Sequence, residues 1–185
     1  MKGRGIKGEG LVIISGERGT SKMSAEMGEY VVGSYLKIIN GCNFVDYNVR
    51  RPGGGLAGLD ELDVVGLDFM KKIAYLCEAT THIRGLLYTD NATTVRRIRQ
   101  KYEKQREYAE DYLQDFPSRH FMFWSPVVPK GYITQKLQKI SGLELVINEE
   151  YTTRIRELQQ KAKEMANDTG NPFFRALQIL EHLRY

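Results

Sequence analysis

The stretch LDELDVVGLDFMKKIAYLCEATTH, residues 59–82, constrains the fold of this chain more than any other segment. Two short apolar runs, 62–67 and 73–77, flank a polar segment, which is the pattern of two neighbouring strands joined by a turn. Each run carries a carboxylate where a strand normally buries apolar groups. Asp63 lies near the start of the first run, and Glu78 closes the second. The stretch therefore predicts a hairpin that carries acids in its strands.

Because side chains alternate across a strand, the acids of the predicted hairpin can be assigned to its faces. Glu61 and Asp63 share one face of the first strand, and Glu78, Thr80 and His82 share one face of the second. If these two faces coincide, the carboxylates cluster at one end of the hairpin. Clustered carboxylates repel one another and are costly to bury, so a hard cation such as magnesium would offset their charge. The alternative is that Asp63 and Glu78 are strand-end residues in solvent.

The spacing of these acids resembles the PD-(D/E)xK nuclease superfamily, also called restriction-endonuclease-like. Its members carry an Asp on one strand and an acid-any-Lys triplet on the next, and they cleave phosphodiester bonds with magnesium. Further short matches lie in the leading helix, the first strand and the helix after the catalytic strand, so the resemblance covers roughly residues 24–125. These matches are Gly28-Glu29, Tyr35-Leu36, Gly41, Asn48, Arg50, Lys101, Ala109 and Tyr112-Leu113.

The resemblance implies a fold, a cofactor and a set of site residues. The fold would be α/β, with a restriction-endonuclease-like core, a central mixed sheet flanked by helices, and extra C-terminal helices. Asp63 and Glu78 would hold one or two Mg²⁺ (or Mn²⁺) ions, and the backbone carbonyl of Ala79 would add a ligand. Glu29, at the start of the leading helix, would be a third acid that holds a water of the metal site. A favourable interaction with the helix dipole is the other explanation for Glu29.

One position departs from the family pattern. The triplet reads Glu78-Ala79-Thr80, so Thr80 stands where the family has the Lys that positions or activates the attacking water. Lys101 or Gln105, on the following predicted helix, would then orient the water or neutralise the developing charge, because a polar group on a buried helix stripe needs a partner. Otherwise Lys101 extends along the surface and Gln105 lies at the core edge. Thr80 favours the alternative function, a catalytically inactive module that binds nucleic acid or a partner protein.

The charge of the chain permits a polyanionic partner without demanding one. The formal net charge is +4 and the isoelectric point is near 9.0. Arg50 and Arg51 precede the glycine run 53–55, and Arg96 and Arg97 begin the longest predicted helix. We expect these four arginines to contact the backbone of DNA, with RNA as a second possibility. A plain flexible connection and a solvated helix face are the competing interpretations.

The chain divides into three predicted parts. Residues 1–22 read as a flexible N-terminal arm with a short strand, 23–148 as the α/β core, and 149–185 as a helical extension packed on the core or in a homodimer contact. Within them, apolar periodicity predicts the following elements. The helices are 24–39 (capped by Ser21 or Ser24), 91–116 (capped by Asn91 or Thr93), 132–140, 149–166 and 171–183, and the further strands are 42–49, 121–128 and 143–147.

The remaining chemistry-bearing residues give weaker signals. Cys42 and Cys77 are expected to be small buried hydrophobes in a reducing compartment. His82 is either a ligand or general base beside Thr80, or a hydrogen-bonded structural residue. No apolar run is long enough to cross a membrane, and the run 11–14 is too short for a signal-peptide core, so we expect a cytoplasmic protein without a membrane partner.

Overall fold

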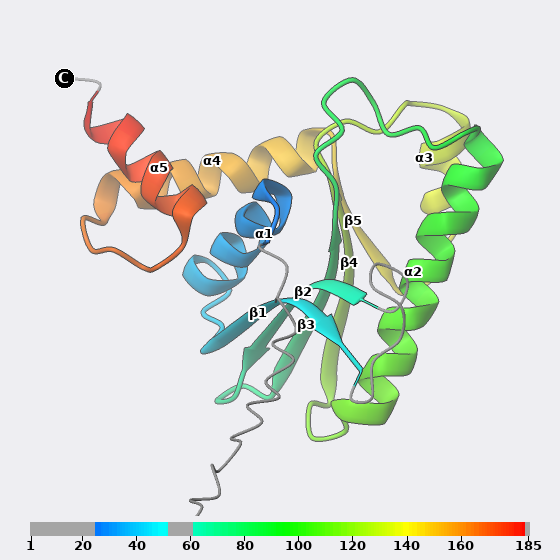
Figure 1. Ribbon diagram of the computed structural model, residues 1–185, viewed down its shortest axis with the longest axis horizontal. Coiled ribbons are helices and arrows are strands. Elements are labelled where there is room, and N and C mark those ends of the chain that lie inside the picture. The colour runs from blue at the N-terminus through cyan, green and yellow to red at the C-terminus, as the bar shows by residue number, and fades with distance from the viewer. Residues whose placement is uncertain (1–24, 52–60, 184–185) are drawn as a thin grey trace, which may run out of the picture.

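The computed structural model describes residues 25–51 and 61–183, which form a five-stranded mixed sheet with helices on both faces (Figure 1). The predicted arm with its short strand and the glycine run 53–55 lie outside the described residues. In chain order the elements are α1 (Met27–Ile38), β1 (Phe44–Arg50), β2 (Glu61–Asp68), β3 (Ile73–Ala79), α2 (Asn91–Tyr112), β4 (Ser118–Ser125), α3 (Tyr132–Leu137), β5 (Leu143–Ile147), α4 (Glu149–Glu164) and α5 (Pro172–His182).

The strands lie in the order β1-β2-β3-β4-β5. β1, β2 and β3 form an antiparallel meander, in which β1 pairs with β2 and β2 pairs with β3. β4 pairs parallel to β3 and β5 parallel to β4, with α2 and α3 as the crossover connections. The predicted α/β class, with a central mixed sheet flanked by helices, is confirmed.

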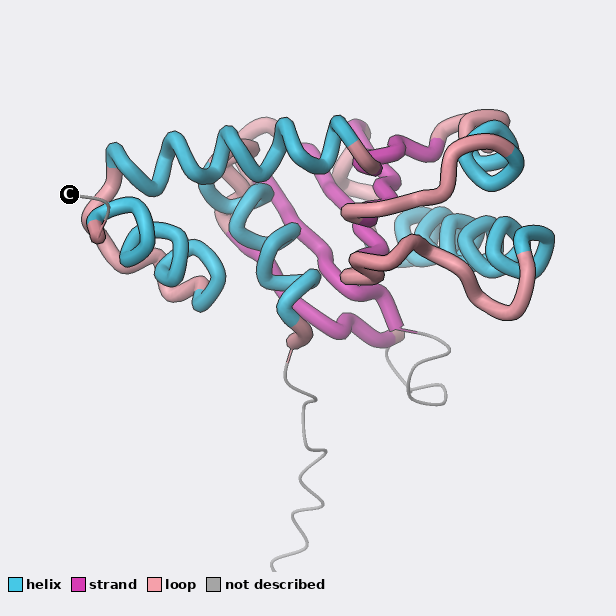
Figure 2. The backbone as a smooth tube through the Cα atoms, turned by 90° about the horizontal axis from the view of Figure 1, so that it is seen from above, coloured by secondary structure: helices cyan, strands magenta, loops and turns pink. Residues whose placement is uncertain are grey.

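Two layers of helices cover the sheet. α1, α4 and α5 lie on one face, and α2 and α3 lie on the other (Figure 2). The first face buries Cys42 and Cys77, as expected, together with Trp124 of β4 and Leu158 of α4. The C-terminal helices therefore pack on the same core as the sheet. None of the helices in the described ranges is long and apolar enough to cross a lipid bilayer.

Helix α1 is buried on almost every side, because it lies between the sheet and helices α4 and α5. It begins at Met27, later than the sequence predicted, and the expected caps Ser21 and Ser24 lie outside the described residues. Glu26 is the residue at the N-cap, and its backbone N–H donates to Glu29 Oε2 at 3.2 Å. The first turn of α1 therefore depends on a carboxylate that is itself buried.

Helix α2 differs from its predicted span at the C-terminal end. It ends at Tyr112 and not at 116, because Leu113 and Phe116 turn back beneath the helix and are buried against the sheet. Its N-cap is Asp90, whose carboxylate accepts the N–H of Thr93 at 2.7 Å. Burying apolar side chains outweighs continuing the helix by another turn.

Strand β4 lies three residues earlier than the predicted strand 121–128. Its first residues, Ser118 to His120, are polar, yet they pair with Ile73 to Tyr75 of β3. Pairing continues to Ser125, and Pro126, which has no N–H to donate, follows at once. The register of the neighbouring strand, and not hydrophobicity, sets where β4 begins.

Gly33 permits the close packing of α1 on β1. A Cβ atom at position 33 would overlap the ring of Tyr47, including its hydroxyl. A glycine-to-alanine change inside a helix normally stabilises by about 1 kcal/mol, but here overpacking should reverse the sign. We expect Gly33→Ala to lower the free energy of unfolding by about 1–3 kcal/mol in urea titrations.

The double variant Gly33→Ala/Tyr47→Ala tests that cause. With the ring of Tyr47 removed, the alanine at position 33 should no longer destabilise the protein, so the two changes should be strongly non-additive. Additive effects would show that Tyr47 does not limit the space at Gly33.

Candidate active site

Strands β2 and β3 stop pairing with each other at the position of their two acids. Their pairing runs from Asp68 with Ile73 to Val64 with Cys77. Beyond that pair, β2 stays paired with β1, and β3 stays paired with β4. Asp63 and Glu78 are the next residues on each strand, and residues that face one another across an antiparallel pair lie on the same side of the sheet. The expected convergence of the two acids is therefore built into the hairpin register.

The carboxylate of Asp63 links β2 to β3 where the two strands no longer pair. Its Oδ2 accepts the backbone N–H of Ala79 at 2.8 Å. Thr80, the next residue, donates its N–H the other way, to the carbonyl of Trp124 on β4, at 3.0 Å. The N–H of Ala79 thus points toward β2, where Asp63 replaces the missing ladder partner. This bond fixes the aspartate relative to the strand that carries Glu78.

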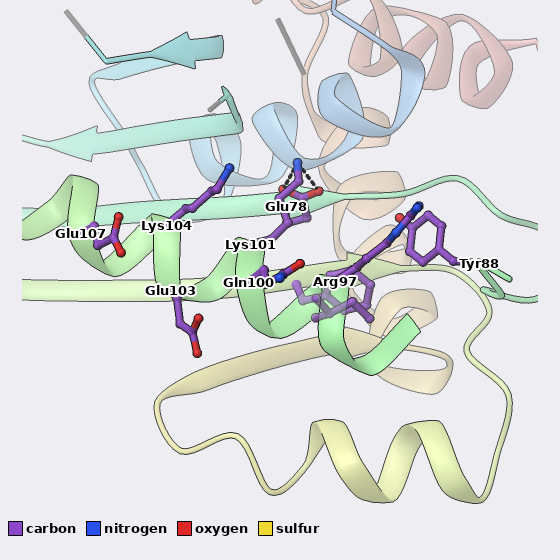
Figure 3. Close-up of a pocket in the computed structure, with 10 residues that line it drawn as sticks. Glu78, Tyr88, Arg97, Gln100, Lys101, Glu103, Lys104 and Glu107 are labelled. Carbon is purple, nitrogen blue, oxygen red and sulfur yellow. Dashed lines mark hydrogen bonds and ion pairs between the residues drawn. The ribbon is translucent and has the colours of Figure 1, made fainter. Parts of the chain in front are cut away.

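Lys101 of α2 reaches both acids. Its Nζ lies 2.9 Å from Glu78 Oε1 (Figure 3). The same Nζ lies 3.9 Å from Asp63 Oδ1. The side chains of Asp63, Glu78 and Lys101 are only 16%, 14% and 29% exposed. Because water is largely excluded, these charges interact much more strongly than they would on an open surface. Of the two predicted substitutes for the missing lysine, the structure brings Lys101 to the acids.

Burial and mutual repulsion keep a proton on the acid pair. Burial raises the pKa of Glu78 to about 8, and the charge of Asp63 adds to this effect while Lys101 opposes it. Burial also raises the pKa of Asp63, although Lys101 and the N–H of Ala79 act against the change. For Lys101, burial alone would lower the pKa, but the two acids outweigh it and the pKa is raised. Lys101 therefore stays an ammonium group at neutral pH.

Glu29 approaches this site from the other layer of the fold. A Cβ at the preceding Gly28 would lie 2.7 Å from Thr81 Cγ2, so the start of α1 packs directly on the segment that follows β3. Glu29 is only 7% exposed. Burial raises its pKa to about 7; the N–H of Glu26 opposes this, and the charge of Asp63 reinforces it.

Three predicted site residues have other partners. Gln105 is 1% exposed, and its Nε2 donates to the carbonyl of Met122 at 3.3 Å, so it braces α2 on β4 and does not meet the acids. The hydroxyl oxygen of Thr80 accepts the N–H of His82 at 3.3 Å, within the turn that ends β3. His82 is exposed, and its ring packs edge-on against Tyr88. Gln105 thus packs against the core, which was the alternative interpretation, and a catalytic role for Thr80 stays a prediction.

The four arginines predicted to bind nucleic acid separate into two pairs. Arg50 forms an ion pair with Glu61 at 3.3 Å, and Arg51 with Glu107 at 2.9 Å, so their charges are already matched by protein carboxylates. Arg96 and Arg97 are exposed on the first turns of α2. Of the four arginines, only Arg96 and Arg97 form no short ion pair with a carboxylate in the described part of the chain. These two are therefore the ones that could contact a nucleic acid.

A cavity of about 650 Å³ opens beside the acid pair. Glu78 and Lys101 line it together with Tyr88, Arg97 and Lys104 (Figure 3). Sequence reasoning missed Lys104 and Tyr88. The spacing of Lys104 from Lys101 on one helix face could have indicated the first, whereas the position of Tyr88 depends on the tertiary fold.

Comparisons with models of known protein families, with curated proteins and with solved structures found no match for this chain. Within residues 25–51 and 61–183, no group of three or more His, Cys, Asp or Glu side chains is arranged to hold a metal ion. Asp63 and Glu78 still present a pair of carboxylates that share Lys101, and Glu78 lines the cavity. Magnesium is commonly held by one or two carboxylates, with waters and substrate phosphates completing its shell.

The raised pKa values predict how folding stability depends on pH. The folded protein keeps protons on Glu78 and Glu29 that the unfolded chain loses near pH 4.5, so their contribution is full below that pH and is lost as the pH rises through about 7 and 8. We expect the free energy of unfolding to fall by an amount on the order of a few kcal/mol between about pH 5 and about pH 9.

Glu78→Gln should flatten this pH dependence, because glutamine cannot ionise. The matched control is Glu110→Gln, a change of an exposed acid on α2 that should leave the slope as it is. Chemical denaturation at several pH values measures both variants. An unchanged slope in Glu78→Gln would contradict a proton held at this residue.

Proposed function

We propose that this protein is a metal-dependent nuclease that hydrolyses phosphodiester bonds, built on a restriction-endonuclease-like core. The observation that carries the proposal is the cluster of Asp63, Glu78 and Lys101, in which Glu78 and Lys101 also line a cavity. The order of elements also supports it. A leading helix, a first strand, a strand with the Asp, a strand with the second acid and a following helix succeed one another, as the resemblance implies.

Lys101 supplies the cationic group that Thr80 does not. It comes from α2 and not from β3, but its Nζ reaches within 2.9 Å of Glu78. Because its pKa is raised, it remains protonated and does not act as a base. Its ammonium group can orient water or offset negative charge that builds up on a phosphate in the transition state.

The chain's own residues fit a hard divalent cation. Asp63 and Glu78 would hold it, with the backbone carbonyl of Ala79 as the further ligand that the resemblance implies. A bound Mg²⁺ or Mn²⁺ would lower the pKa of water and polarise the phosphate. Asp63 is held in place by the N–H of Ala79, so the carboxylate needs little reorganisation to bind. Glu29, with a pKa of about 7, can accept a hydrogen bond or proton from water near Asp63.

Substitution of the cluster tests the proposal. With magnesium or manganese, the wild type should cleave labelled DNA or RNA, and Asp63→Asn, Glu78→Gln and Lys101→Met should each lower the rate by about a hundredfold or more. Glu110→Gln serves as the matched control and should cut like the wild type. Circular dichroism confirms that each variant is folded. A wild type that neither cleaves any nucleic acid nor binds either ion would refute the nuclease.

Metal binding should depend on pH, because the cation must displace the proton on the acid pair. Glu78 has a pKa of about 8 without metal, so the affinity for Mg²⁺ or Mn²⁺ should rise about tenfold per pH unit up to that pH and then level off. Calorimetric titration at several pH values measures this. An affinity that is flat below pH 8 would mean that the ion binds elsewhere.

One observation favours the second candidate, a catalytically inactive module that binds nucleic acid or a partner protein. Lys101 already neutralises the acids, since its Nζ lies 2.9 Å and 3.9 Å from their oxygens. In such a module, Lys101 would be the permanent counter-ion and no metal would bind. Nucleic-acid affinity would then depend on salt, and Asp63→Asn would leave it unchanged.

A further inference from the structure

An aromatic ring and a guanidinium group are stacked beside the acid pair. The guanidinium carbon of Arg97 lies 4.8 Å from the ring centroid of Tyr88, and both side chains line the cavity that contains Glu78 (Figure 3). Tyr88 precedes α2, and Arg97 lies two turns into that helix. Together they place an aromatic ring and a guanidinium group in contact on the wall of the cavity.

Tyr88 is held in this position by its backbone. Its N–H donates to Thr94 Oγ1 at 3.0 Å, and the hydroxyl of Thr94 in turn donates to the carbonyl of Asp90 at 2.7 Å. On the other side, Leu86 is fully buried and its N–H donates to the carbonyl of Val127 at 2.9 Å. The ring is therefore anchored to the first turn of α2 and to the segment after β4.

A row of cations runs along the same wall of the cavity. Arg97, Lys101 and Lys104 are spaced by four and three residues, so they lie on one face of α2 over about 10 Å. Glu103 and Glu107 also border the cavity, but Glu107 is paired with Arg51 at 2.9 Å. A phosphate chain can thus contact Arg97 next to Lys101 on this wall.

The size of the cavity limits what can reach the acids. Asp63 and Glu78 are only 16% and 14% exposed, so a phosphate must enter the cavity to approach them. A volume of about 650 Å³ falls in the usual range for sites that hold small molecules and suits one or two nucleotides. A base within a duplex is already stacked on its neighbours, so only an unpaired or flipped-out base can enter the cavity and stack there.

From these observations we propose that the site takes single-stranded nucleic acid or an unpaired strand end, with one base stacked on the Arg97–Tyr88 surface beside the phosphate that faces Glu78. Unpaired bases stack on aromatic rings and on guanidinium planes, and every base offers such a face. Recognition is therefore tolerant of sequence and selective for unpaired strands. As a statement about the substrate it rests on the proposed nuclease, whereas the stacking itself can be measured without metal.

Fluorescence anisotropy in EDTA provides the test, with a labelled single-stranded DNA, an RNA of the same sequence and the corresponding blunt duplex. The wild type should bind the single strands at least about tenfold more tightly than the duplex. Tyr88→Ala should weaken single-strand binding about tenfold, and Tyr88→Phe should bind like the wild type. Tyr88→Leu keeps apolar bulk without an aromatic face and should behave like Tyr88→Ala, which guards against a folding artefact.

Tyr132→Ala is the matched control, because Tyr132 is an exposed tyrosine with its own cation, Lys136 Nζ, at 5.6 Å from the ring centroid. It should bind like the wild type. Duplex binding as tight as single-strand binding, or equal losses in Tyr88→Ala and Tyr132→Ala, would overturn the inference.

The outcomes also separate this inference from the proposed nuclease. Intact stacking without metal binding or cleavage would refute only the nuclease, and duplex cleavage independent of Tyr88 would refute only the single-strand preference. Comparing the affinities for the single-stranded DNA and for the RNA shows which nucleic acid the protein prefers.

Discussion

The folded structure depends on accommodating two acids at the point where β2 and β3 separate. Burying a carboxylate is costly unless charge and hydrogen bonds compensate, and here each compensation comes from a different element. β3 offers the N–H of Ala79 to Asp63, and α2 offers Lys101 to Glu78. Apolar contacts through Ile98 and Ala109 fix α2 on the sheet. They therefore also fix the position of Lys101 relative to the two acids. The packing of α2 on the sheet therefore also determines how the charges of Asp63 and Glu78 are compensated.

Much of this arrangement could be predicted from the sequence, because it follows from local alternation. The apolar runs of the hairpin predicted β2 and β3, and the alternation of side chains assigned Asp63 and Glu78 to one face of each strand; that the two faces coincide follows from the register of the hairpin. The choice between Lys101 and Gln105 could not be made, since the two lie one turn apart on neighbouring parts of the helix surface. Burial decides it: Gln105 is turned into the core and bonded to Met122, whereas the longer lysine extends to the acids.

Apart from Lys104, the features that sequence reasoning missed depend on contacts between distant segments. Arg51 and Glu107 are far apart in the chain, so nothing local indicates that the arginine is already paired. The polar start of β4 looks unlike a strand until the register of β3 is known. The same holds for Tyr88, whose ring meets Arg97 only because the segment before α2 folds back over that helix.

The position of Glu29 couples the charge of the site to the end of a helix. The same carboxylate accepts the N–H of Glu26, and the charge of Asp63 raises its pKa, which is about 7. When Glu29 takes up a proton, it becomes a weaker acceptor for that N–H and a poorer match for the positive end of the helix dipole. Fraying of the first turn of α1 is therefore tied to the acidity of its surroundings, and local order at this end of the helix responds to the charge on Asp63.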